Sequence, residues 1–79
     1  FTFTAHGCEL RIDNEQVAEV FAELSPTEQS ILILRFVMDM TDKEVGAVLG
    51  MSRCAVQRRR TKTLDKMRDK LKTLLPKGG

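Results

Sequence analysis

The sequence predicts a mainly α-helical fold: a four-helix domain with a C-terminal helix-turn-helix and a long recognition helix, preceded by a short N-terminal β-hairpin. Three observations predict this class. Apolar residues recur at helical spacing through most of the 79-residue chain, helix-start signals precede these stretches, and residues 1–12 alternate in polarity instead. A chain this short forms one small domain, with residues 1–12 as an N-terminal extension and residues 13–79 as the helical unit.

The N-terminal segment reads as two strands that turn near His6-Gly7. One side of the strands carries the apolar side chains, which are Phe1, Phe3, Cys8, Leu10 and Ile12. Because two strands alone are only marginally stable in water, we expect this side to lie on the helices. His6 has no neighbouring ligand or acid that would give it a metal or catalytic role.

Two helices follow the hairpin. Asp13 or Asn14 caps the first, which runs to about Leu24 and places one apolar stripe at helical spacing. The stripe consists of Val17, Val20, Phe21 and Leu24. The second begins at Ser25-Pro26-Thr27-Glu28, where serine is the N-cap, proline takes the first helical position and glutamate closes a capping box.

The second helix continues into an apolar run from Ile31 to Met38, interrupted by Arg35. A helix that is apolar nearly all the way round is either central to its domain or has a second face bound to another protein. We favour the central position, because a small helical domain needs one helix that touches the others. A partner surface on this helix is the alternative.

The stretch from Thr41 to Lys62 reads as a helix-turn-helix. Thr41 and Glu44 form a capping box, and Gly50 allows the left-handed backbone of a sharp helix end. Ser52 caps the next helix. The apolar residues of this unit are Val45, Val48 and Leu49 before the turn, Met51 at the corner and Val56 after it.

The recognition helix is expected to be long, from about Arg53 to Leu75. Its later apolar residues are Leu64, Met67, Leu71 and Leu74. We expect this stripe to pack on the first helix. A coiled coil is the alternative, but the stripe covers fewer than three heptads.

Charge is strongly segregated along the chain. Residues 1–50 hold three basic and nine acidic side chains, whereas residues 51–79 hold ten basic and two acidic ones. A basic pole attracts polyanions. A solvated lysine- and arginine-rich helix would explain the charge alone, but here the basic run begins where a helix-turn-helix meets DNA.

The second helix of such a unit fits the DNA major groove, where its N-terminal residues reach base edges. Arginine pairs with guanine and glutamine with adenine, while other cations contact phosphate. The side chains expected to bind DNA are Ser52, Arg53, Cys54, Gln57, Arg58, Arg60, Thr61 and Lys62. Cys54 is interpreted as a small side chain that allows close approach, with a redox switch as the alternative.

Several classes of protein are excluded by the sequence. The chain has one histidine, no glycine-rich phosphate loop and no recognisable pair of catalytic acids, so we expect no enzyme. No cysteine spacing indicates a metal site, and no cofactor is expected. No apolar run is long enough to span a membrane. We therefore expect a cytoplasmic protein with free thiols, and the absence of an initiator methionine suggests a piece of a longer chain.

Residues 24–68 resemble region 4 of bacterial sigma-seventy-type RNA polymerase sigma factors. The similarity lies in Leu-x-x-x-Glu-x-x-Ile-Leu-x-Leu-Arg-Phe, then Met-Thr-x-x-Glu-Val-Gly-x-Val-Leu-Gly-Met-Ser, then Ala-Val-x-x-Arg-x-x-x-x-Leu. This pattern is more specific than a generic helix-turn-helix. The arrangement also resembles small sigma-like regulators of mobile conjugative elements.

The resemblance implies that double-stranded promoter DNA is bound at a minus-thirty-five-type element. Arg53, Cys54, Gln57 and Arg58 would face bases and nearby backbone, and Lys62 would contact phosphate. It also implies docking on the flap of the RNA polymerase beta subunit, with an anti-sigma protein as a further partner. The residues of the apolar helix expected to contact the partner are Ile33, Arg35, Phe36 and Val37.

Two features depart from the family pattern. The family usually has at least one apolar residue where Arg59 and Arg60 stand, so arginine stems fill the core there or the added charge strengthens the grip on DNA. The N-terminal hairpin is not a standard part of region 4, and no promoter-melting region is evident, so we do not expect this chain alone to open DNA.

Two other functions stay open at the level of the sequence. One is a stand-alone transcriptional regulator of the LuxR-like kind, which would dimerise on a palindromic site. The other is a protein-interaction module that binds polymerase or an anti-sigma partner, with DNA incidental.

Overall fold

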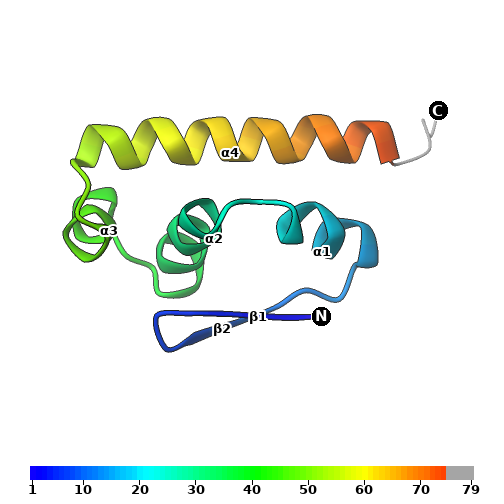
Figure 1. Ribbon diagram of the computed structural model, residues 1–79, viewed down its shortest axis with the longest axis horizontal. Helices are drawn as coiled ribbons and strands as arrows, with labels where there is room; N and C mark the ends of the chain where they lie inside the picture. Colours follow the sequence, from blue (N-terminus) through cyan, green and yellow to red (C-terminus); the bar gives the residue numbers. More distant parts are fainter. Residues whose placement is uncertain (75–79) are drawn as a thin grey trace.

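The structure is a computed structural model that describes residues 1–74, and it confirms the expected fold class. The chain forms a hairpin and then a series of helices (Figure 1). Strand β1 spans Thr2–Ala5 and β2 spans Cys8–Arg11; they are followed by α1 (Glu15–Ala22), α2 (Pro26–Leu32), the π-helix η1 (Ile33–Val37), α3 (Asp42–Leu49) and α4 (Arg53–Leu74). Helix α4 lies along one side, the hairpin along the other, and the shorter helices lie between them.

The hairpin is antiparallel, with Phe3 opposite Leu10. Its turn is at His6-Gly7, as expected, and both residues have a positive φ, 51° and 76°, as the tightest hairpin turns require. The ring of Phe3 meets that of Phe21 edge-on, with 4.6 Å between centroids. The apolar side therefore packs on the helices, except for Phe1, which is 63% exposed rather than covered.

The helix starts follow the capping signals. The Asn14 side chain accepts a hydrogen bond from the amide of Val17, and the capping box of α2 pairs Ser25 with Glu28 in both directions. Each bond satisfies an amide that the first turn of a helix leaves free. Helix α1 ends at Ala22, two residues before the end that the sequence predicts at about Leu24, although Leu24 is buried.

Two apolar clusters form the core. One lies under the hairpin and contains Phe21, Leu24, Leu32 and Ile33, with Met67 of α4 packed against it. The other lies between α3 and α4 and contains Ile31, Leu34, Val45 and Val56, with Met40, Leu49 and Met51 at its margin. Because α2 and η1 contribute to both clusters, the expectation that this apolar run is central to the domain is confirmed.

The sequence suggested that the apolar run continues α2 as one regular α-helix, but the structure differs. From Ile33 onward it widens into a π-helix, in which the amide of Met38 donates to the carbonyl of Ile33 at 3.2 Å. A π-turn holds one more residue than an α-turn. The side chains after Leu34 therefore point differently, and Phe36, Val37 and Met38 are exposed.

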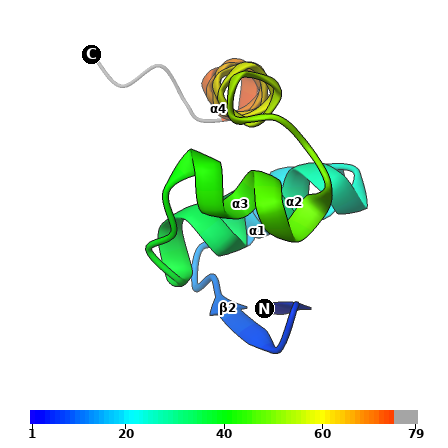
Figure 2. The same ribbon diagram turned by 90° about the vertical axis from the view of Figure 1, so that its left-hand side faces the viewer.

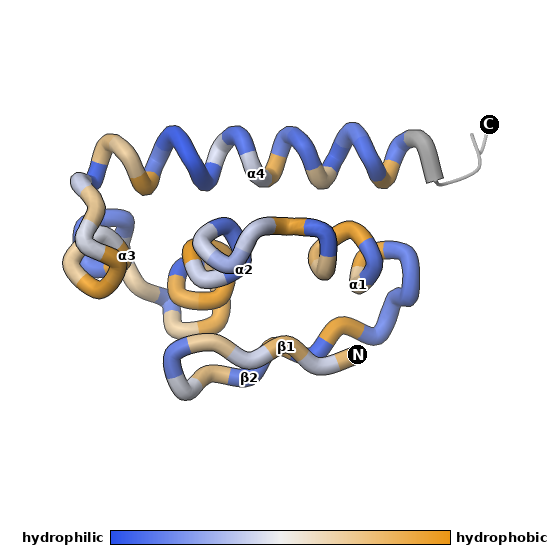
Figure 3. The backbone as a smooth tube through the Cα atoms, in the orientation of Figure 1, coloured by the Kyte–Doolittle hydropathy of each residue, from blue (hydrophilic) through white to orange (hydrophobic). Residues whose placement is uncertain are grey.

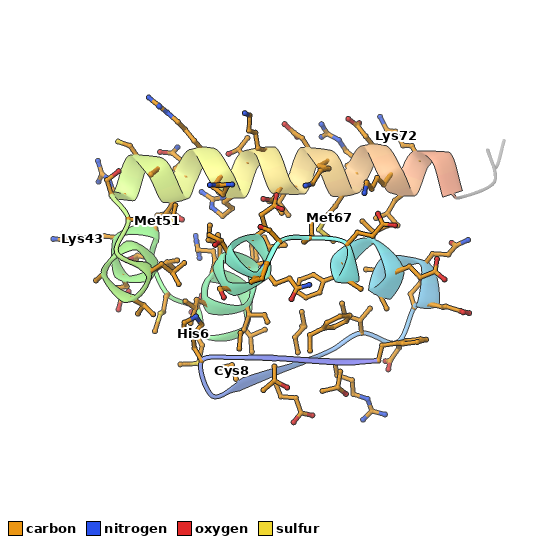
Figure 4. All side chains as sticks on the ribbon, in the orientation of Figure 1. His6, Cys8, Lys43, Met51, Met67 and Lys72 are labelled. Carbon is orange, nitrogen blue, oxygen red and sulfur yellow. The ribbon has the colours of Figure 1, made fainter. Side chains whose placement is uncertain are left out.

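Helix α4 packs through a stripe that only partly matches the expected one. Val56 and Thr63 are fully buried and the expected Met67 and Leu71 are half-buried, whereas Leu64 is 38% exposed. Figure 4 shows Met67 projecting from α4 toward the shorter helices and Lys72 projecting from the opposite side. The seven- and four-residue steps from Val56 select Thr63 and Met67, so the neighbouring Leu64 turns outward. Leu75 lies outside the described residues.

Candidate nucleic-acid interface

The turn between α3 and α4 packs its backbone closely against α3, and the chain then continues into α4 (Figure 2). Gly50 has the left-handed conformation expected of it, with a φ of 70°. The amide of Met51 donates to the carbonyl of Gly46 at 2.8 Å, and a Cβ atom on Gly46 would lie 2.3 Å from the Met51 oxygen. Position 46 therefore has no room for a side chain, and a larger residue there would push the turn away from α3.

The first turn of each helix is capped by its own side chains. Thr41 and Glu44 form the expected capping box on α3, and the Ser52 hydroxyl accepts from the amide of Ala55 at 3.1 Å on α4. Hydrogen bonds from the backbone amide and the hydroxyl of Thr41 lower the pKa of Glu44. The carboxylate therefore stays charged at the positive end of the helix dipole.

Seven of the eight residues expected to bind DNA lie on one exposed surface. We call this the reading surface; it consists of the exposed residues Ser52, which caps α4, and Arg53, Cys54, Gln57, Arg58, Thr61 and Lys62 in the first half of the helix. Residues three and four apart on a helix project together, so the surface follows the outer side of α4. It combines cations with a glutamine, which suits contacts to both phosphates and bases.

Arg59 was not among the expected DNA-binding residues, but it lies on the same side. It lines a surface hollow of about 600 Å³ together with Arg58 and Lys62, over a floor formed by Met51 and Ala55. Three cations around one hollow attract an anion such as a phosphate. The signal in the sequence was the run Arg58-Arg59-Arg60, in which Arg59 and Arg60 depart from the family pattern and add charge.

Arg60, the eighth expected residue, does not belong to the reading surface. Its guanidinium turns toward α3 and forms two hydrogen bonds with Asp42, Nε to Oδ1 at 3.1 Å and Nη2 to Oδ2 at 3.0 Å. This pairing does not support the expected placement of Arg60 with the DNA-contacting side chains. The Arg60 side chain is 22% exposed and lies partly covered against α3.

The cations of α4 divide into two groups. In the second half of the helix Lys66 pairs with Glu28 at 3.2 Å, Arg68 pairs with Asp65 at 2.9 Å, and Lys70 pairs with Glu23. Within residues 1–74, no acidic side chain lies within ion-pair distance of the first-half cations, which are Arg53, Arg58, Arg59 and Lys62. Most of the uncompensated positive charge of the described part of α4 therefore lies on the reading surface and on the adjacent Arg59.

Glu28 anchors the second half of α4 to α2. Burial would raise the pKa of this carboxyl group, but hydrogen bonds from the Ser25 amide, the Thr63 hydroxyl and the Lys66 ammonium group hold it at about 2. The Thr63 hydroxyl lies 3.0 Å from Glu28 and 2.7 Å from the carbonyl of Arg59. Polar contacts thus fix the helix directly behind the reading surface.

The residues expected to bind a protein partner are only partly accessible. Ile33 is 0% exposed within the cluster under the hairpin, so its place in a partner surface is wrong. Phe36 and Val37 are exposed, and the Arg35 guanidinium lies 5.8 Å from the Phe36 ring centroid. The adjacent Met38 is exposed as well and was missed, because apolar character all around the run concealed which side faces outward.

Residues 20–69 match the family model described as Sigma-70, region 4. The match spans more than half of the chain and includes the whole unit from α3 through the reading surface. The chain belongs to the sigma-70 region 4 family. Region 4 is a DNA-binding helix-turn-helix region of sigma-like factors, and its members are regulatory domains rather than enzymes. The hairpin lies outside the matched part of this region 4 chain.

Further comparisons add no relative. Neither the search of curated proteins nor the search of solved structures gave a match. Among the helices of residues 1–74, none is long and apolar enough to cross a membrane. In the same residues no three histidine, cysteine, aspartate or glutamate side chains are grouped so as to hold a metal ion, and Cys8 and Cys54 are free.

Proposed function

We propose that this chain is the promoter-recognition module of a sigma-like transcription initiation factor. The observation that carries the proposal is the group of cations without an acidic partner among residues 1–74, together with Gln57, on the exposed first half of α4. In this proposal α4 enters the major groove at a minus-thirty-five-type element. Arg53, Cys54, Gln57 and Arg58 meet base edges and nearby backbone, and Lys62 and Arg59 contact phosphates.

A titration with double-stranded DNA across a salt series tests this function. The domain is titrated with a minus-thirty-five-like duplex and with a scrambled duplex of the same composition. We expect tighter binding to the first and a steep fall in affinity with salt, because cations that neutralise phosphates release counterions. A steep slope without sequence preference would eliminate base reading. A two-fold symmetric binding site with two copies bound would favour a LuxR-like regulator.

The second part of the proposal is docking on RNA polymerase through the exposed apolar end of η1. Phe36 is 57% exposed, and Val37 and Met38 lie beside it on the chain. Exposed neighbouring apolar side chains of this size are typical of a protein-binding site. The proposed partner is the flap of the beta subunit, and an anti-sigma protein is a competitor for the same residues.

A pull-down with the isolated polymerase flap tests the docking. The variant Phe36→Ser combined with Val37→Ser should lose retention on the flap while keeping duplex binding. Phe1→Ser is the matched control, because Phe1 is equally exposed but lies on the hairpin. Equal retention of both variants and the wild type would refute the assignment of this surface.

A further inference from the structure

The Arg60–Asp42 pair joins the two helices of the helix-turn-helix. Both side chains are largely covered, with 22% of Arg60 and 18% of Asp42 exposed. A pair with two parallel hydrogen bonds fixes orientation as well as distance. It therefore holds the first half of α4 in one position relative to the start of α3.

Asp42 also serves a second arginine. The Nε atom of Arg35 lies 3.5 Å from Oδ1 of Asp42 and has no hydrogen-bond partner within the described chain. Asp42 is the first residue of α3, where the helix dipole favours a negative charge. One carboxylate thus balances two guanidinium groups, and without it both arginines would lose their partner inside the fold.

The position of Arg60 on the helix explains why it differs from its neighbours. It follows Val56 by four residues and precedes Thr63 by three, so it shares their inward side. Arg58 and Arg59 are exposed. The three arginines are adjacent and chemically identical, and the Asp42 carboxylate is what separates the third from the other two.

We infer that Asp42 is the positioning residue for DNA reading by this chain. It keeps Arg60 away from DNA and fixes the tilt of α4, so that contacts come from the reading surface alone. This inference rests on the proposed DNA-binding function. When the carboxylate charge is removed, the long Arg60 side chain becomes free to reach solvent and add a sequence-independent phosphate contact. The preference for one DNA sequence then falls, while the affinity for DNA of any sequence rises.

Four proteins test the inference: the wild type and the variants R58Q, R60Q and D42N. Each is titrated across a salt series with a duplex that the wild type selects from a random pool and with a scrambled duplex. On the scrambled duplex, R60Q should keep the wild-type dependence of log affinity on log salt, whereas R58Q should make this negative slope shallower by about one. D42N should make the slope steeper by about one and reduce the preference for the selected duplex about tenfold.

The outcomes separate the inference from the function on which it rests. A shallower slope in R60Q would mean that Arg60 already contacts phosphate, and would overturn the inference. Unchanged slope and preference in D42N would overturn it too. If D42N does not fold, the double variant D42L/R60L replaces the pair by apolar side chains. A wild-type salt dependence in this variant supports the inference, and a slope shallower by about one overturns it. Failure of the wild type to bind any duplex would refute the proposed function itself.

Discussion

The two halves of α4 carry similar numbers of cations and use them differently. Residues 53–62 include five basic side chains and residues 63–72 include four. Among the described residues, one of the five in the first half, Arg60, is paired with an acid, whereas three of the four in the second half are, namely Lys66, Arg68 and Lys70. The comparison teaches that a basic run indicates a binding surface only where the fold leaves its charge uncompensated.

The second half of α4 is an anchor made largely of polar contacts. Figure 3 shows that most of α4 is hydrophilic, with apolar residues at intervals along it. Met67 supplies an apolar contact, while Thr63, Lys66 and Lys70 reach Glu28 and Glu23. Because these contacts in the second half of α4 hold the helix on the domain, the first half can be polar and exposed and still remain attached.

The largest effect is expected from removing the buried acid of the anchor. Glu28→Ala removes the acceptor that Thr63 and Lys66 share and breaks the capping box of α2, although the Thr63 hydroxyl can still donate to the carbonyl of Arg59. We expect the free energy of unfolding to fall by about 2–4 kcal/mol, measured by urea denaturation. Glu44→Ala is the matched control, because it breaks the other capping box at an exposed site and should cost less. Equal losses in the two variants would contradict an anchor at Glu28.

The anchor also makes stability depend on acid. The pKa of Glu28 is about 2 in the folded chain against an ordinary 4.5, so between these values the unfolded chain binds more protons. The stabilisation is complete above pH 4.5 and is lost as the pH falls toward 2, by about 3 kcal/mol in total.

Denaturation at a series of pH values checks this dependence. In Glu28→Gln the corresponding part of the acid loss should disappear. The pKa of Glu44 is lowered as well, so Glu44→Gln is measured in parallel to separate the two groups. An acid profile of Glu28→Gln that matches the wild type would contradict the role of Glu28.

A smaller effect is expected on the reading surface, and on binding rather than stability. Arg58→Ala should weaken duplex binding about tenfold, or about 1.4 kcal/mol, with the urea midpoint unchanged. Arg68→Ala is the control, because this exposed arginine of the same helix is already paired with Asp65. Wild-type affinity in Arg58→Ala, or an equal loss in both variants, would remove the distinction between the halves.

The smallest effect is expected for the outermost ion pair of the anchor. Lys70 and Glu23 are substantially exposed, and such pairs contribute little because water and salt screen them. Lys70→Ala should change the free energy of unfolding by less than about 0.5 kcal/mol and leave DNA affinity unchanged. A loss comparable to that of Glu28→Ala would show that the anchor extends to the end of the described helix.

Local signals in the sequence predicted the elements, and long-range contacts decided the rest. The caps at Ser25, Thr41 and Ser52 depend on residues within three positions, so the sequence placed them correctly. Thr63 and Leu64 illustrate the limit. Hydrophobicity favoured the leucine as the buried residue, but the threonine is inward because Glu28, 35 positions away, accepts its hydrogen bond.

The candidate site shows the same division. The reading surface followed from helix periodicity and charge, which are local properties. The exclusion of Arg60 depends on Asp42, 18 positions earlier, and the burial of Ile33 depends on the hairpin that covers it. Neither partner can be inferred from the neighbouring residues, because both contacts exist only once the helices have packed.

The π-helix at Ile33–Val37 acts as a change of phase in the middle of the domain. Side chains before it and at its start face the two core clusters, whereas Phe36 and Val37 in its second half are exposed. The exposed position of these residues is therefore encoded in backbone geometry rather than in residue type. Deleting a single residue from this segment would restore the α-helical period and rotate the following side chains by roughly 100°, so that a different set of them would face the core without any change in their chemistry.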